Sequence, residues 1–150
     1  LHEVVRGGDL AAVRDLIAAG AKIDERDKLK RTALHIAAWA GHFEIVQMLV
    51  RVNATLDVKA MDAFTPLHFA AQSSAPGAAE CIRFLARKNK ALLRMPITKG
   101  NKSPIHLAVA KGVKANIIAL LEAGADPTAK TTSGQTALDL ARTPEVRQLL

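Results

Sequence analysis

Thr65-Pro66-Leu67-His68-Phe69-Ala70-Ala71 is one copy of a phrase that recurs along this chain of 150 residues. Related copies begin at Thr32, Ser103 and Thr136, and the chain opens inside another copy. The third residue of each copy gives the spacing, and these residues are Leu1, Leu34, Leu67, Ile105 and Leu138. The steps between them are 33, 33, 38 and 33 residues. A regular period of this length indicates an array of units that stack on their neighbours.

Each phrase has the features of a helix start. The hydroxyl of Thr32 is suited to accept from a backbone amide in the first turn, and proline follows the cap at Pro66, where its fixed φ fits a helix. In the first unit the apolar spacing predicts a helix from Asp9 to Ala19. In the second unit it predicts one helix from Ala33 to just before Gly41 and another over 44–51. The predicted buried face of that second helix consists of Ile45, Val46, Met48, Leu49 and Val50.

The third unit is five residues longer than its neighbours, whose period is 33. In the other units the second helix ends at a residue that tolerates the left-handed conformation, and these residues are Gly20, Asn53 and Gly124. The equivalent residue of the third unit is Asn89, which comes three positions late. We therefore place three extra residues in the turn 72–77 and two in the loop 92–102. Both insertions are expected at the surface, where added length costs little.

The period and the Thr-Pro-Leu-His opening resemble the ankyrin repeat, as does Leu121-Glu122-Ala123-Gly124-Ala125-Asp126. The resemblance covers the whole chain in five units, the outer two incomplete. It implies an all-α solenoid of stacked helix-turn-helix units linked by hairpin-like loops. We predict a single domain over 1–150, with units 1–31, 32–64, 65–102, 103–135 and 136–150. The last unit is expected to cap the array, since Asp139 replaces the repeated histidine and polar residues surround it.

Composition excludes several classes of protein. The chain is 49% hydrophobic, but its apolar residues are spread evenly and form no membrane-length run. One cysteine rules out an internal disulfide framework. No signal-peptide pattern opens the chain. We expect a monomeric domain without membrane insertion, cytoplasmic or nuclear, and part of a longer protein because Leu1 begins inside a repeat.

Four of the five histidines occupy the same place in successive units, and they are His2, His35, His68 and His106. Stacked helices place such residues roughly 10 Å apart, too far for one metal ion. They are expected to bond loop backbone and cap hydroxyls, and His42 is likewise expected to be structural. No phosphate loop, paired-carboxylate site or nucleophile elbow is present. The sequence predicts a non-enzyme with no cofactor and no metal.

Cys81 adjoins the apolar face of a predicted helix, beside Ile82 and Leu85. This position favours a buried and inert thiol. The alternative is a reactive thiol, because Arg83 and Arg87 are close in sequence and cations lower a thiol pKa.

The resemblance implies that partners bind on the concave side, through the loop tips and the positions just before the turn between the helices. The matching residues are Arg26, Lys28, Leu29, Arg31, Trp39, Lys59, Met61, Phe64, Lys99, Lys111, Lys130 and Arg142. Trp39 is the only tryptophan, and with Met61 and Phe64 it is predicted to form an apolar anchor flanked by cations. The alternative is that Trp39 packs on an adjacent loop or covers Phe64, and that the charges form a solvated face.

We predict a non-catalytic protein-protein interaction module that binds an acidic, partly apolar segment of another protein. The formal net charge of +7 supports an acidic partner. One alternative is recognition of nucleic acid or a phosphorylated ligand on the same face, with Trp39 stacking on a base. Another is that the chain is the targeting domain of a larger enzyme or channel.

Overall fold

The fold is all-helical, as predicted, and the computed structural model describes residues 1–150. The α-helices are α1 (His2–Gly7), α2 (Leu10–Ala18), α3 (Ala33–Ala40), α4 (Phe43–Arg51), α5 (Pro66–Gln72), α6 (Ala78–Lys88), α7 (Pro104–Lys111), α8 (Lys114–Ala123), α9 (Ala137–Leu140) and α10 (Pro144–Arg147). Two 3-10 helices, η1 (Met61–Ala63) and η2 (Lys90–Arg94), lie in the loops. None of the helices has both the length and the apolar composition to cross a bilayer.

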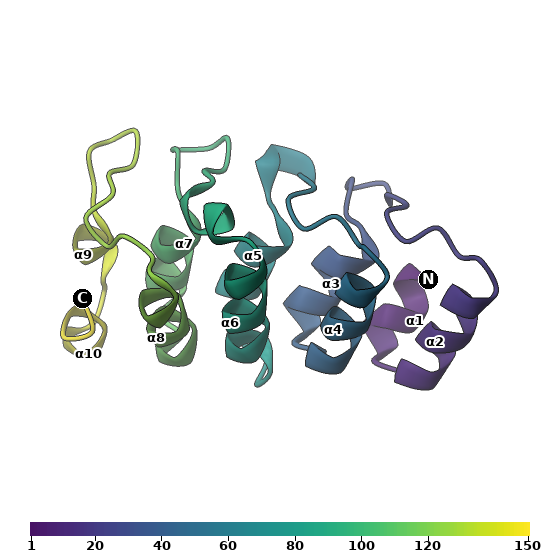
Figure 1. Ribbon diagram of the computed structural model, residues 1–150. Helices are drawn as coiled ribbons and strands as arrows, with labels where there is room; N and C mark the ends of the chain where they lie inside the picture. Colours follow the sequence, from purple (N-terminus) through teal and green to yellow (C-terminus); the bar gives the residue numbers. More distant parts are fainter.

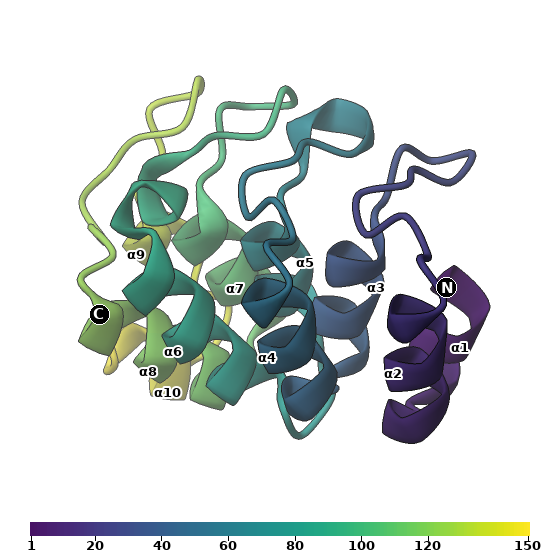
Figure 2. The same cartoon turned by 45° about the vertical axis from the view of Figure 1, so that its right-hand side comes forward.

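The helices form consecutive pairs that stand side by side, and long loops project from one edge along the whole stack, at the top of the view (Figure 1). The first helices of the pairs contact one another in one row, α1, α3, α5, α7 and α9. A second row consists of α2, α4, α6 and α8 (Figure 2). We call the surface formed by the loops and the first row the concave face, and the surface of the second row the outer face.

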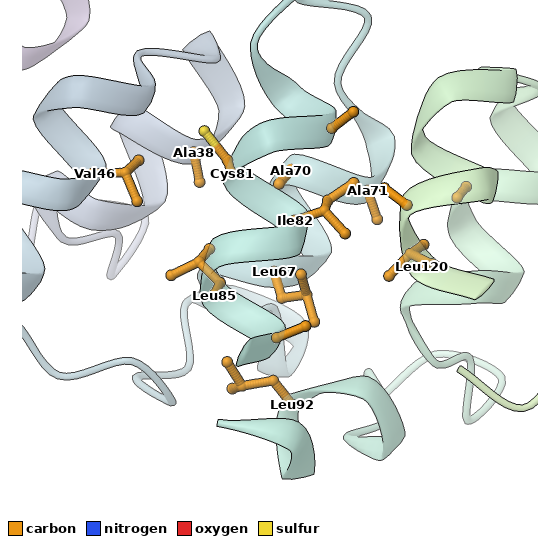
Figure 3. Close-up of a cluster of buried hydrophobic side chains, with 14 of the residues drawn as sticks. Ala38, Val46, Leu67, Ala70, Ala71, Cys81, Ile82, Leu85, Leu92 and Leu120 are labelled. Atoms are coloured by element: carbon orange, nitrogen blue, oxygen red, sulfur yellow. The ribbon is translucent and has the colours of Figure 1, made fainter. Parts of the chain in front are cut away.

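A continuous core of 31 buried side chains runs between the two rows. At its centre, Leu67 of α5 meets Ile82 and Leu85 of α6, while small residues such as Ala70 let the helices approach closely (Figure 3). Cys81 is fully buried in this layer, and burial raises the pKa of its thiol to about 12. The thiol is therefore protonated and inert, as predicted.

The buried face of α4 is narrower than predicted. Ile45, Val46 and Leu49 are buried, but Met48 and Val50 are only half-buried. At about 100° per residue, these two side chains lie roughly 100° from the centre of the buried stripe, on opposite flanks. They cover the edges of the core instead of filling it.

The insertion between the two helices of the third unit lies where it was predicted, and the loop after α6 holds the other two extra residues. Leu49 comes 17 residues after Thr32, whereas its counterpart Leu85 comes 20 residues after Thr65, so three extra residues lie in the turn between α5 and α6. The loop 89–102 takes up the other two. One of them is in the hairpin tip, because Ile97 N–H donates to Lys102 O across five residues where the other tips span four.

The prediction for Asn89 itself was wrong. Gly20, Asn53 and Gly124 are left-handed, with φ of 90°, 64° and 102°. Asn89 is instead extended, with φ −150° and ψ 98°, and its side chain accepts a hydrogen bond from Ala91 N–H at 3.1 Å. The residues after α6 wind into η2, and Asn89 caps that helix, so the chain leaves α6 without a left-handed turn.

The longer turn after α5 is held by hydrogen bonds to the neighbouring units on both sides. Ser73 Oγ donates to the Trp39 carbonyl at 2.6 Å. The buried amide of Asn116 in α8 donates to the carbonyls of Ala70 and Ser73, at 3.2 and 2.7 Å. The Asn116 amide bonds carbonyls at the end of α5, where Ser73 is extended and no left-handed glycine follows the helix. They also fix Trp39 relative to α5.

Candidate partner-binding face

Histidines in the first-helix row hold the loops of the concave face. The Nδ1 atom of His35 accepts from Thr32 N–H at 3.0 Å, and its Nε2 lies 3.0 Å from the Phe64 carbonyl. His68 repeats the pattern with Thr65 N–H at 3.1 Å and the Met95 carbonyl at 2.8 Å. Since a carbonyl only accepts, Nε2 carries the proton and Nδ1 is left as an acceptor. Each imidazole thus links a helix start to the next loop, as predicted.

These rings are unsuited to proton transfer at neutral pH. Burial lowers the pKa of both His35 and His68 to about 4, so both are neutral. His106 makes the equivalent bonds, to Ser103 N–H at 3.1 Å and the Ala129 carbonyl at 2.8 Å. His2 contacts two carbonyls of the first loop, and His42 contacts the Arg6 carbonyl at 3.2 Å. No three His, Cys, Asp or Glu side chains converge as metal ligands.

Backbone hydrogen bonds join the tips of neighbouring loops into one continuous surface. Met61 N–H donates to the Leu29 carbonyl at 3.2 Å, and Thr98 N–H donates to the Asp62 carbonyl at 2.8 Å. Thr132 N–H donates to Gly100 O at 2.9 Å in the same way. The histidines fix the base of each loop, and these hydrogen bonds fix its tip. The loops therefore have little freedom to rearrange. Binding to such a surface loses little conformational entropy of the loops.

The first two loops and α5 enclose a shallow apolar pocket of about 190 Å³. Four of the predicted binding residues line it together, namely Leu29, Arg31, Met61 and Phe64. Ala60, Phe69 and Gln72 complete the lining. Leu29 and Met61 are about half exposed, at 48% and 52%. Two members of the predicted apolar anchor, Met61 and Phe64, therefore lie together in this pocket beside Leu29.

Phe69 is the pocket residue that the sequence analysis missed. It belongs to the repeated phrase, and the residues at its position in the flanking units, Ile36 and Leu107, are both buried. Phe69 is larger and only half-buried, so its ring reaches the concave surface. An aromatic residue at a position that Ile36, Leu107 and Leu140 fill in other units was the available signal.

Trp39 lies at the edge of this pocket, packed edge-on against Phe69 with ring centroids 6.2 Å apart. Phe69 in turn packs against Phe64 at 5.8 Å, so that three aromatic rings form a connected row. Trp39 nevertheless remains 47% exposed. The packing orients the indole and leaves a large part of it available to a ligand. We call Leu29, Trp39, Met61, Phe64 and Phe69 the apolar cluster.

The predicted cations divide into paired and free groups. Arg31 is bound to Asp27 through Nη2 at 2.7 Å, and Lys99 lies 3.7 Å from Asp62. Burial opposes ionisation of Asp27, but hydrogen bonds from the Arg31 side chain and from loop amides prevail and lower its pKa. The six other predicted cations are exposed and form no ion pair, and these are Arg26, Lys28, Lys59, Lys111, Lys130 and Arg142.

Lys111 and Arg142 lie away from the apolar cluster. Both line a hollow of about 360 Å³ between the ends of α7 and α10, together with Lys114 and Glu145. The structure thus divides the predicted site into an apolar cluster on the first units and a separate charged hollow on the last ones.

A two-row helical solenoid whose loops present an exposed apolar cluster defines a repeat-type binding scaffold. The family model that matches residues 1–95 is described as ankyrin repeats (3 copies). The chain belongs to the ankyrin repeat family. Repeats of this family are generally protein-protein interaction modules and are generally not catalytic.

Several larger proteins contain similar segments. Human "Ankyrin repeat and SOCS box protein 16" is 32% identical over 85% of this chain, which corresponds to 27% of that protein. Human "Inversin" is 32% identical over 69% of the chain and 10% of its own length. "E3 ubiquitin-protein ligase KEG" from Arabidopsis thaliana is 31% identical over 94% of the chain and 9% of its own length. The chain therefore spans about a quarter or less of the relatives it matches.

Proposed function

We propose that this chain binds an extended, acidic and partly apolar segment of a partner protein on its concave face. One observation carries the proposal. Of the six large apolar side chains that are exposed, Leu29, Trp39 and Met61 gather around one pocket. Exposed apolar groups gathered in this way are typical of interaction sites, whereas single ones are common on any surface.

The apolar cluster is the source of affinity in this proposal. Covering the exposed halves of Leu29, Trp39 and Met61 contributes about 1 kcal/mol each before ordering costs. The free cations Arg26, Lys28 and Lys59 on the flanking loops steer an acidic segment and favour one orientation. Their contribution weakens as salt rises, while the apolar contribution persists.

Two alternative functions have less support. Nucleic acid on the same face would need several aromatic stacking surfaces, but Trp39 is the only aromatic residue that is exposed, and Arg31 and Lys99 lie beside carboxylates. A role as the targeting part of a larger enzyme or channel is compatible with the proposal. Relatives with such names include the E3 ligase above and the Caenorhabditis elegans "Transient receptor potential cation channel subfamily A member 1 homolog", 36% identical over 77% of the chain.

A peptide selection tests the proposal. A library of random extended peptides is selected on the immobilised wild-type chain and counter-selected on Trp39→Ala. We expect enriched sequences that combine Asp or Glu with one large apolar residue. Substitution of Ile118, which is 37% exposed on α8, by Ala is the matched control and should leave the enrichment unchanged. Enrichment without acidic or apolar preference, or equal retention on Trp39→Ala, would show that the proposal is wrong.

A further inference from the structure

Charge is distributed unevenly along the chain. The segment from Cys81 to Leu121 holds nine of the 21 basic residues and none of the 14 acidic ones. The remainder of the chain therefore has a small excess of acidic groups. The basic segment contains most of α6, all of η2 and α7, and most of α8. Its cations make the middle of the solenoid strongly positive.

Four of these cations converge on the outer face. A hollow of about 310 Å³ between α6 and α8 is lined by Arg83, Arg87 and Lys90. A second hollow of about 450 Å³ is lined by Lys90 and Arg94. Both hollows include Lys90 and Ala123, so they form one elongated groove. We call it the outer groove, and it lies on the side of the molecule where α6 and α8 are seen together in Figure 2.

The fold neutralises only part of this charge. Arg83 Nε lies 3.1 Å from Glu122 Oε2, and Glu122 is the single acidic residue in the lining. Arg87, Lys90 and Arg94 are exposed and form no ion pair. Hydrogen bonds from Thr128 and, to a smaller extent, the charge of Arg94 lower the pKa of Asp126 nearby. Among the lining side chains, four cations face one carboxylate, an excess of three positive charges that Asp126 beside Arg94 partly offsets.

We propose that the outer groove binds an extended protein segment that carries two phosphorylated residues. Cations at both ends of an elongated groove match two anionic groups spaced along a chain. Three of the four cations are arginines, whose planar guanidinium groups bind phosphate oxygens in pairs. A carboxylate of the ligand near Arg83 would only replace Glu122 as the partner of the guanidinium group, and the number of ion pairs would not rise. A phosphate brings nearly two charges and three acceptor oxygens, and so exceeds what Glu122 already supplies.

The lining of the groove favours a phosphorylated segment over other polyanions. Apart from its charged residues it offers only Ala86, Ala91, Leu93, Ala123 and Gly124, with Leu93 buried. It therefore has no aromatic ring on which a nucleic-acid base could stack. It has no large exposed apolar side chain to insert into a lipid surface either.

Fluorescence anisotropy with labelled peptides tests this site. The probes are Gly/Ala/Ser peptides with two phosphoserines separated by one to four residues, their unphosphorylated forms, and forms with Glu at both positions. We expect one phosphorylated spacing to bind best and the unphosphorylated form not to bind. The double variant Arg87→Glu/Arg94→Glu should lose at least tenfold in affinity. The control Lys28→Glu/Lys59→Glu makes the same change of net charge on the concave face and should lose less than threefold.

Circular dichroism is used to establish that both double variants are folded, and Arg87→Gln/Arg94→Gln serves as a milder second pair. Trp39→Ala should not alter phosphopeptide binding, which separates this site from the concave face. The proposal is overturned if no phosphopeptide binds, if both double variants lose affinity equally, or if the Glu peptide binds as tightly. Tighter binding of single-stranded RNA, or of vesicles containing phosphatidylinositol bisphosphate, in competition at about 150 mM salt would overturn it as well.

Discussion

Mild acid should destabilise this protein through two buried histidines, His35 and His68. Burial lowers the pKa of His35 and His68 from 6.5 to about 4. The unfolded chain therefore binds these protons more readily than the folded chain does. The stabilisation is complete above pH 6.5 and is lost as the pH falls toward 4. Protonation would also place a proton on Nδ1, which already faces the backbone N–H of Thr32 or Thr65.

The loss of stability can be calculated from the change in the pKa of each histidine. A difference of 2.5 units between 6.5 and about 4 corresponds to about 3 kcal/mol for each histidine. Between pH 7 and pH 5 each should lose about 2 kcal/mol, so the two together lose about 4 kcal/mol. This is a large part of the 5–15 kcal/mol that is typical for a domain. Most carboxylates titrate below pH 5, so this window isolates the histidines.

The free energy of unfolding is measured at several pH values by urea unfolding, with circular dichroism as the readout. His68→Asn is the matched variant, because its carbonyl can accept from Thr65 N–H much as Asp139 accepts from Thr136 N–H in the last unit. The variant should be less stable at pH 7 but should lose stability with pH only about half as steeply as wild type. A flat wild-type profile between pH 7 and pH 5, or equal slopes in the two proteins, would refute the reasoning.

Three further substitutions test the packing and the loops by urea unfolding at neutral pH. Leu67→Ala removes a fully buried side chain and should cost about 2 to 5 kcal/mol, and a cost below 1 kcal/mol would contradict its place in the core. Gly77→Ala would press a Cβ against the backbone carbonyl oxygen of Gly41 and should cost about 1 to 3 kcal/mol. The matched change Gly7→Ala meets no atom within 4 Å and should be neutral or stabilising. Ala63→Gly relieves a left-handed residue with φ 65° and should stabilise by about 0.5 to 1 kcal/mol; destabilisation would show that the loop does not hold that conformation.

Local chemistry explains why the helix starts were predictable. Each Thr or Ser followed three residues later by His makes the same capping arrangement, as Thr65 and His68 do. The identity of two residues at fixed spacing is enough to specify these contacts. The same holds for Gly20 and Gly124, where a left-handed turn is most easily made by glycine.

Asn89 shows where that reasoning stops. An asparagine can end one helix or begin the next, and the two roles use different backbone conformations. Which role it takes depends on whether the residues after it wind into η2. That outcome is decided by burial of Leu92 and Leu93 against the core, which is a tertiary effect.

The candidate sites were predictable only in part for a similar reason. The repeat register placed Leu29, Met61 and Phe64 on neighbouring loops, and the structure brings them into one pocket. The register did not show that Asp27 would hold Arg31, because ion pairs depend on side-chain geometry. The outer groove joins residues of α6 and η2 to the end of α8, and its shape depends on the unusual path of the chain after Asn89.

Tryptophan fluorescence tests the central claim most directly, because Trp39 is the only tryptophan in the chain and is 47% exposed. The best peptide from the selection is titrated into the wild-type chain at low and high salt. Binding at the concave face predicts a saturable blue shift of the emission at both salt concentrations, with weaker affinity at high salt. Binding seen by anisotropy of a labelled peptide without any change in Trp39 emission would contradict the account, because the peptide would then occupy another surface.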